Sequence, residues 1–541
     1  MRAAAAAPAA PALGVRLGPA YDSASNMPDW HKGRRAGIIL HPTSLPGPYG
    51  IGELGAEAFA FLDWLADAGM QCWQVLPLVP PDAQYYSPYS GTDANCGNPL
   101  LISLDALITE GLLAPSDAPS GLKASGDVDF EAVAAAKAPL LSKAARALLA
   151  EPRFAALRAS MARFRAANPW IEDSALFDAL RRRPELEDKE WWAWPEPLRL
   201  RDARALADAR KRHDAEIAEF VAVQFLFDRQ WRAVKTYANS LGIKVVGDMP
   251  IYVGGQSADV WANRHLFELD EATCEPTEVS GVPPDAFSET GQLWGSPLYR
   301  WPAHEAEGYA WWAARLARAF SLYDETRIDH FRAFAGYWSV DAGEETAMNG
   351  SWCQGPGLAL FDALKARLGE VPIMAEDLGV ITSDVVALRE AIGAPGMVVL
   401  QFAWGGGPTN VHLPHMHYEN SFCYPGTHDN ETSVGWFKGS ANAQDKSYLR
   451  QYLGSDGSDV AWDFIRAAMM SVSRTSIIML QDVMRLDNSA RMNTPGKAAG
   501  NWAWRAGDSG VWERLAPEGR ALRELAHAYG RLPRGARLDH A

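Results

Sequence analysis

The stretch "YDETRIDHFRAF", residues 323–334, places six charged or titratable side chains in a run that otherwise has the apolar pattern of a buried strand. Arg327 and Asp329 are two residues apart, so they lie on the same face of a strand. Asp324 and Glu325 precede them, and we expect these two acids at the opposite, structural end of that strand. Such a strand is expected in a parallel sheet in which polar residues gather at one edge.

Seven other short apolar runs resemble this one, and each ends in polar or Gly/Pro-rich residues. They are "GIILH" (37–41), "CWQVLPL" (72–78), "KVVGDMPIYV" (244–253), "VPIMAEDLG" (371–379), "GMVVLQFAW" (396–404), "FCYPGTHDN" (422–430) and "SIIMLQDVM" (476–484). Helix-like stretches separate most of them, for example 55–69, 220–242 and 357–369. Strand and helix alternating eight times predict an α/β fold, a (β/α)₈ TIM barrel. A doubly wound open sheet is the structural alternative.

The spacing of the runs indicates insertions in this barrel. Residues 105–215, between the second and third runs, are rich in Ala, Leu and Arg with helical periodicity, which predicts an inserted helical subdomain. Residues 269–301 carry four prolines and three glycines, so they cannot form one regular element. We expect them to act as lid loops. The catalytic barrel is assigned to 36–541, without a C-terminal β-domain.

Residues 1–35 are set apart from the barrel by their composition. This segment is rich in Ala and Pro, has no acid before Asp22 and contains no apolar core of the kind a secretory signal needs. An organelle transit peptide, or its remnant, and a low-complexity tail are both consistent with it.

Composition excludes several classes of partner. The chain has 51 Lys+Arg against 66 Asp+Glu, a net charge of −15, and no basic block, so neither nucleic acid nor a membrane surface is expected to bind. No run of about eighteen apolar residues predicts a membrane span. Five scattered cysteines indicate a reducing compartment. The 21 tryptophans are a weak indication of carbohydrate binding. Oligomeric state is not indicated.

The acids that close the predicted strands are the candidate catalytic groups. They are Asp248, Asp329, Glu376 with Asp377, Asp429 after His428, and Asp482 after Gln481. In a barrel these strand ends would converge at one mouth. Arg327 would keep Asp329 ionised, and burial would raise the pKa of Glu376. One ionised and one protonated carboxyl group is the arrangement that glycoside chemistry uses. The alternative is a buried ion-pair network that only fixes the barrel.

Other motifs are weaker. His412, His415 and His417 have a spacing that could suggest a metal, but Pro414 breaks any helix there and no cysteine joins them, so no metal is predicted. "WGGGP" (404–408) fits no phosphate-binding pattern, and no cofactor is expected.

Several longer motifs occur together and in order between residues 36 and 505. They include "GIILHPTSLPGPYGIGELG", "SPYSG", "GDMPIYV", "PPDAFSETGQLWGSPLYRW", "RIDHFRAF", "AEDLG", "GTHDNET" and "ARMNTP". With these motifs the sequence resembles the 4-alpha-glucanotransferases of glycoside hydrolase family 77, which include bacterial amylomaltase and the plant disproportionating enzyme. The run "SPYSG…DANCGN" looks more like the plant and algal plastid form, which suggests a chloroplast enzyme of starch metabolism, or a cytoplasmic one if the chain is bacterial.

The resemblance implies roles for individual residues. Asp329 would be the nucleophile, Glu376 the acid/base and Asp429 the third acid. The other residues that it implies for substrate binding are Arg327 and His428 beside the acids, Ser87 and Tyr89 on the donor side, Asp285, Glu289 and Trp294 in the lid, and Asp248 and Asn493.

The resemblance also implies an activity. The enzyme would move an α-1,4-glucan segment from a donor malto-oligosaccharide to the 4-OH of an acceptor glucan or glucose, by retaining double displacement through a covalent glucosyl-enzyme. An α-amylase-type hydrolase shares the barrel and its acids and is the first alternative. A non-catalytic glucan-binding protein on the same barrel is the second.

Overall fold

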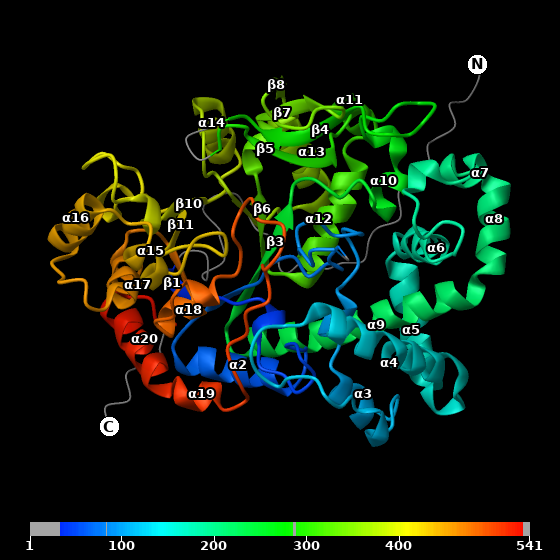
Figure 1. Cartoon of the computed structure of the whole chain (residues 1–541), viewed down its shortest axis with the longest axis horizontal. Coiled ribbons are helices and arrows are strands. Elements are labelled where there is room, and N and C mark those ends of the chain that lie inside the picture. The colour runs from blue at the N-terminus through cyan, green and yellow to red at the C-terminus, as the bar shows by residue number, and fades with distance from the viewer. Residues whose placement is uncertain (1–32, 83, 285–287, 534–541) are drawn as a thin grey trace, which may run out of the picture.

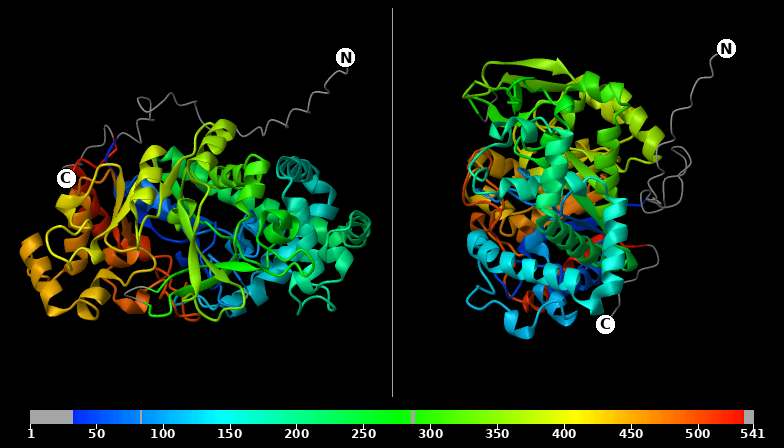
Figure 2. Two further views of the ribbon diagram at one scale, coloured as in Figure 1. Left: turned by 90° about the horizontal axis from the view of Figure 1, so that it is seen from above. Right: turned by 90° about the vertical axis from the view of Figure 1, so that its right-hand side faces the viewer.

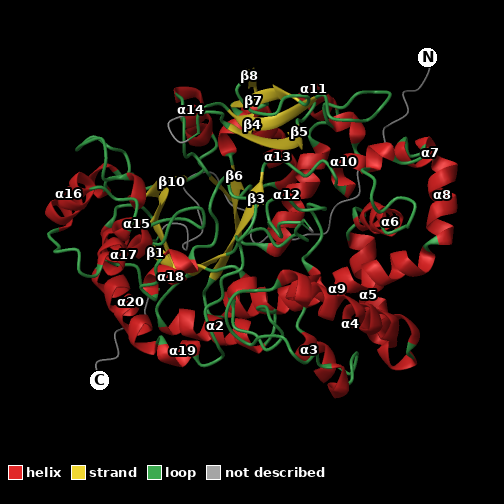
Figure 3. Ribbon diagram, viewed as in Figure 1, coloured by secondary structure: helices red, strands yellow, loops and turns green. Residues whose placement is uncertain are grey.

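A closed barrel of parallel strands forms the centre of the molecule (Figures 1 and 3). The computed structural model describes residues 33–82, 84–284 and 288–533. The sheet order is β10-β11-β12-β1-β2-β3-β6-β9. The N–H of Ala375, the last residue of β9, donates to the carbonyl of Pro395, just before β10 (2.9 Å), which closes the ring. The (β/α)₈ prediction is confirmed. The strands are β1 (Arg35–Ile39), β2 (Cys72–Gln74), β3 (Lys244–Pro250), β6 (Glu325–Asp329), β9 (Ile373–Ala375), β10 (Gly396–Val399), β11 (Ser421–Tyr424) and β12 (Thr475–Met479).

The stretch 323–334 is strand for less than half of its length. β6 ends at Asp329 because His330 adopts a left-handed backbone conformation (φ 57°), and a 3₁₀ helix follows over Phe331–Phe334. The predicted strand was therefore too long. At the other end, Glu325 pairs with the buried Arg35 of β1 (2.6 Å), so its structural role is as predicted.

Helices cover the outside of the barrel. Those predicted near 55–69, 220–242 and 357–369 are present, and the second begins earlier than predicted, at Asp214. The helices outside the segment between β2 and α9 are α2 (Ala56–Asp67), α9 (Asp214–Ser240), α10 (Ala258–Ala262), α11 (Trp301–Ala306), α12 (Ala310–Leu322), α13 (Gly357–Leu368), α14 (Ser383–Ala391), α15 (Ser433–Lys438), α16 (Ala443–Leu453), α17 (Val460–Met470), α18 (Leu480–Val483), α19 (Val511–Arg514) and α20 (Ala516–Ala528). None of the helices in the described ranges is long and apolar enough to cross a membrane.

The chain between β2 and α9 is helical and extends from one end of the molecule (Figures 1 and 2). Its helices are α3 (Leu104–Thr109), α4 (Phe130–Ala150), α5 (Ala155–Ala167), α6 (Ile171–Arg181), α7 (Glu196–Arg199) and α8 (Ala203–Arg212). Lys137 of α4 is fully buried and pairs with Glu53 from the loop after β1, which attaches this region to the barrel. The division of the chain at residues 35, 105 and 215 stays a prediction.

A second, antiparallel sheet lies beyond one end of the barrel, at the top of Figure 1. Its order is β5-β4-β7-β8, with β4 (Glu278–Val282), β5 (Gln292–Pro297), β7 (Gly336–Asp341) and β8 (Gly350–Gln354). The stretch 269–301 therefore contributes a β-hairpin as well as loop, because pairing with β7 supplies hydrogen bonds that its own sequence does not indicate. After β12 the described chain contains helices and no strand.

Candidate active site

One buried guanidinium joins two carboxylates at the mouth of the barrel. The β3–β6 register sets Asp248 beside Arg327, whose Nη1 donates to both carboxylate oxygens (2.8 and 2.7 Å). Its Nη2 donates to Oδ1 of Asp329 (2.8 Å). The side chains of Arg327 and Asp248 are 4% and 0% exposed, whereas that of Asp329 is 30% exposed. Asp329 thus has one oxygen fixed by Arg327, and no hydrogen bond from a described residue reaches Oδ2.

Burial opposes the effect of Arg327 on Asp329. The pKa of Asp329 is raised to about 6 because burial, together with the charges of Asp248 and Asp429, outweighs the lowering effect of the Arg327 guanidinium. The predicted influence of Arg327 is present but is not the largest one. Asp329 is ionised at neutral pH.

Glu376 follows β9 and is held by backbone amides. The N–H of His330 donates to Oε2 (2.8 Å) and that of Leu378 to Oε1 (3.0 Å). The left-handed turn at His330 brings its N–H to this carboxyl group. Burial raises the pKa of Glu376 to about 8, with the charge of Asp329 adding to it and Arg327 opposing it. The predicted direction holds, and Glu376 remains protonated at a pH where Asp329 is ionised.

Asp429 and His428 lie on the loop after β11, on the other side of the Asp248–Arg327 pair. The Tyr89 hydroxyl donates to Oδ2 of Asp248 (2.7 Å) and lies 2.7 Å from Nε2 of His428, and the two rings stack. Nε2 of His428 is 3.3 Å from Oδ2 of Asp429. Asn493 donates from Nδ2 to Oδ1 of Asp429 (2.6 Å). One chain of contacts therefore links Asp429 to Asp329.

Two residues that the sequence did not single out support this group. The buried indole of Trp502 lies against the rings of Tyr89 and His428, at 5.7 and 6.2 Å. Its backbone is left-handed (φ 68°), an unusual conformation for a bulky residue. Arg491 donates to the backbone carbonyls of Asp429 (2.7 Å) and Asn493 (2.6 Å). The motif "ARMNTP" contains Arg491, but nothing local indicates which carbonyls it meets.

Not every predicted binding residue joins the group. Trp294 of β5 is 41% exposed and meets the His330 ring edge-on at 4.7 Å. Glu289 is exposed in the turn before β5. Ser87 accepts the N–H of Tyr89 at its Oγ (3.2 Å) and touches none of the acids through a hydrogen bond. Asp285 lies outside the described residues.

Carboxylates from several strands were predicted to converge at the mouth, and two of the acids at strand ends are structural instead. Asp377 accepts the N–H of Met397 (2.7 Å) and pairs with Arg389 (3.1 Å), because it alternates to the opposite side from Glu376. Asp482 lies on α18 and accepts the N–H and the hydroxyl of Ser433 (2.7 and 2.8 Å).

The three histidines considered as metal ligands form hydrogen bonds with other residues of the protein. His412 accepts the N–H of Val399, His415 contacts Tyr452, and His417 contacts Ser471. Within the described ranges, no group of three His, Cys, Asp or Glu side chains could hold a metal ion.

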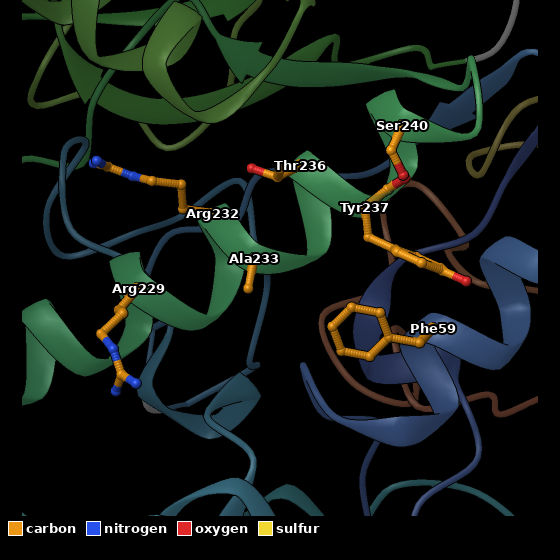
Figure 4. A pocket seen from close by; sticks show the side chains of 7 residues that line it. All are labelled: Phe59, Arg229, Arg232, Ala233, Thr236, Tyr237 and Ser240. Carbon is orange, nitrogen blue, oxygen red and sulfur yellow. The ribbon is translucent and has the colours of Figure 1, made fainter.

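An open depression lies elsewhere on the surface. It has a volume of about 540 Å³ and lies between α2 and α9 on the outside of the barrel (Figure 4). Phe59 and Tyr237 form part of its wall, and none of the acids lines it.

Comparison with known proteins decides the family. The model of glycoside hydrolase family 77, described as 4-alpha-glucanotransferase, matches residues 40–509. The chain belongs to the 4-alpha-glucanotransferase family. It is 51% identical over 534 residues to the chloroplastic/amyloplastic 4-alpha-glucanotransferase of Oryza sativa subsp. japonica, covering 97% of this chain and 89% of that one. It is 45% identical over 509 residues to the 4-alpha-glucanotransferase of Thermus thermophilus, covering 92% and 99%.

Solved structures agree with this assignment. The amylomaltase of Streptococcus agalactiae in complex with acarbose superposes with a TM-score of 0.87 at 35% identity, over 92% of this chain and 100% of that one. The amylomaltase of Corynebacterium glutamicum, at 19% identity and a TM-score of 0.74 over 95% and 77%, shares the fold. This 4-alpha-glucanotransferase is therefore an enzyme, and the predicted transferase is confirmed over the hydrolase and the non-catalytic alternatives.

Proposed function

We propose that Asp329 is the nucleophile and Glu376 the acid/base of a retaining transfer of α-1,4-glucan segments. The observation that carries this proposal is the Arg327 guanidinium, which fixes one oxygen of Asp329 and leaves the other free beside a carboxyl group of higher pKa. Glycoside chemistry of the retaining kind requires an ionised carboxylate and a protonated acid of this description.

In the first step, Oδ2 of Asp329 attacks the anomeric carbon of the donor. The bond from that carbon to the glycosidic oxygen breaks, and the oxygen takes the proton of Glu376. The products are a glucosyl ester of Asp329, a Glu376 carboxylate and a shortened glucan with a free 4-OH. Arg327 keeps Oδ1 in place throughout, so the attacking oxygen does not rotate away.

Formation of the ester prepares Glu376 for the second step. The charge of Asp329 raises the pKa of Glu376, and that charge disappears when the ester forms. The pKa of Glu376 falls, and the group becomes a base. It takes the proton of the acceptor 4-OH while that oxygen attacks the anomeric carbon and the ester bond breaks. Atoms and charges then return to their starting state.

Asp429, His428 and Tyr89 form the opposite wall, in the role of sugar-holding groups. Asn493 donates to Oδ1 of the Asp429 carboxylate and Nε2 of His428 lies beside Oδ2, which fixes the direction of the carboxylate for hydroxyl groups of a bound glucose ring. The partly exposed indole of Trp294 is suited to stacking on a sugar and to excluding water from the ester. Malto-oligosaccharides as donors, and glucans or glucose as acceptors, fit these groups.

We also propose a plastid as the place of action. Three plant relatives at 51%, 50% and 49% identity are named chloroplastic/amyloplastic. Fusing residues 1–35 to a fluorescent protein in plant cells tests this, and cytosolic fluorescence would count against it.

The activity is tested with maltotriose alone. We expect glucose and a ladder of longer malto-oligosaccharides without a net gain in reducing ends. Glucose and maltose with rising reducing ends would show hydrolysis. The variant Asp329→Asn is expected to fold and to lose turnover, and wild-type turnover in it would overturn the assignment of the nucleophile.

A further inference from the structure

A small cavity lies beside the ring of His428. Its polar lining consists of His41, Ser44, His428 and Gln481, and apolar side chains complete it. The space open to the centre of a water-sized probe is about 10 Å³. That is the room that one water molecule needs, provided that it finds two to four polar partners.

Two of the lining histidines have unpartnered nitrogens. Among the described residues, neither Nδ1 of His41 nor Nδ1 of His428 takes part in a hydrogen bond. The two residues are only 6% and 4% exposed. Buried polar atoms without a partner are rare in proteins because each costs free energy. The cavity therefore has room for one water molecule and is lined by two histidines whose Nδ1 atoms have no hydrogen-bond partner among the described residues.

The contacts of Tyr89 fix which nitrogen of His428 carries the proton. Asp248 is a carboxylate bound to Arg327, so it accepts, and the single hydroxyl proton of Tyr89 goes to it. The oxygen of Tyr89 must then accept from Nε2 of His428, 2.7 Å away. Nε2 is therefore protonated, and in the neutral ring Nδ1 is an acceptor that needs a donor.

We propose that one water molecule occupies this cavity and bridges His41 to His428, so that His41 acts as a positioning residue for the site. The proposal rests on the function proposed above for His428 and Asp429.

Each bond of the water molecule has a partner in the lining. Its oxygen accepts from Nδ1–H of His41, and one of its protons goes to Nδ1 of His428. The other is available to Oγ of Ser44, whose own proton points to the sulfur of Met492 (3.6 Å). His41 suits this role because it stays neutral, since burial, and to a lesser extent the nearby His428, lower its pKa to about 3.

The consequence for catalysis is that His428 keeps one tautomer. The titratable or charged groups around it are Tyr89, Asp429, Asp329 and His41. With Nδ1 satisfied by water, Nε2–H stays directed at Tyr89 and Asp429. Without the bridge, the proton can move to Nδ1, and the wall that holds the sugar loses its donor.

The first test needs no activity. A high-resolution crystal structure of the wild-type enzyme is expected to show one water within hydrogen-bonding distance of both Nδ1 atoms. ¹⁵N NMR of the imidazoles, with His428 assigned through His428→Gln, is expected to show the Nε2–H tautomer. An empty cavity, or the Nδ1–H tautomer, would overturn the proposal. Neither measurement uses maltotriose, so the water bridge and the proposed transfer activity can fail independently of each other.

The second test compares variants. His41→Leu is expected to change the His428 tautomer and to lower kcat for maltotriose by about three- to tenfold with little change in KM. His41→Gln keeps an amide donor and should restore most of the loss. His304→Leu is the matched control, because His304 is also buried with an unpartnered Nδ1 but bonds Leu266 away from the acids. An unchanged His428 signal in a folded His41→Leu protein would contradict the bridge, and if that variant does not fold, the wild-type readouts decide.

Discussion

Replacing Arg327 with Met tests how the enzyme keeps its nucleophile ionised. The substitution removes three hydrogen bonds, two buried ones to Asp248 and a partly buried one to Asp329. Among the described residues, Asp248 then keeps only the Tyr89 hydroxyl as a side-chain donor, and Asp329 loses the guanidinium that contacts it. Both the stability of the fold and the pH dependence of the reaction should respond.

The size of each response follows from the contacts. Breaking a buried ion pair by removing one partner costs about 3–5 kcal/mol in the free energy of unfolding. A hydrogen bond to a charged group is worth about 1.5–3 kcal/mol, and about 1.4 kcal/mol corresponds to one pKa unit. The acid limb of kcat/KM, set by Asp329 at about 6, should therefore rise by about one to two pH units. The alkaline limb, set by Glu376 at about 8, should rise by less, because Arg327 acts on it only through space.

The assay is the pH profile of maltotriose disproportionation together with urea unfolding. Activity at pH 6 should fall by about five- to fiftyfold, and activity at pH 8 should fall much less. Arg318→Met is the matched control, since Arg318 forms an equally buried pair with Asp228 outside the site. It should lose stability, somewhat less because Arg232 still contacts Asp228, without moving the acid limb. A folded Arg327→Met enzyme with a wild-type acid limb would refute the reasoning.

Three further predictions concern the acid, the lid and the C-terminal end of the chain. Glu376→Gln should lower kcat for maltotriose by about 10²–10⁴-fold yet raise the thermal midpoint at pH 7. The pKa of Glu376 is higher in the folded than in the unfolded protein, so the wild-type fold loses stability as pH rises from the unfolded pKa to about 8, and Gln removes this loss. An unchanged midpoint across that pH range would count against the raised pKa. Trp294→Ala should weaken transfer relative to hydrolysis. It should change the free energy of unfolding by about 0.5 kcal/mol or less, since the side chain is exposed. A large stability loss with unchanged kinetics would contradict the lid role. Arg531→Met should destabilise the fold by about 3 kcal/mol or more, as measured by urea unfolding. The buried guanidinium donates hydrogen bonds to several backbone carbonyls at the base of the barrel, among them those of Met469, Arg35 and Arg474. The pH profile of activity should not move.

Much of the barrel could be predicted from the sequence because its signals are local. Eight apolar runs, each four or more residues long, marked the eight barrel strands in order, and the intervening periodic stretches marked helices such as α2 and α13. Ends of elements were less certain. The strand at 323–334 stops at Asp329 because a turn residue, His330, is held left-handed by its contact with Glu376, which lies 46 positions away.

The residues of the candidate site also fall into two groups, those that local sequence indicates and those that only tertiary packing brings together. Local motifs singled out Asp329, Glu376 and Asp429, and the i, i+2 spacing placed Arg327 beside Asp329. Spacing could not distinguish Glu376, which points to the site, from Asp377, which caps the neighbouring strand. Nor could it indicate that Trp502 lies against Tyr89 and His428, residues far from it in the chain.

The sequence by itself determined the order of the barrel, the family motifs and the chemical types at the strand ends, since each depends on residues close together in the chain. Only the tertiary structure decided that Asp248 and Asp329 share one guanidinium, that Tyr89 and Asn493 orient the wall around Asp429, and that Asp482 is structural. The reason is physical. Which charges meet, and therefore which pKa values rise, depends on the register between strands and on the closure of the ring, and both are set by packing across the whole chain.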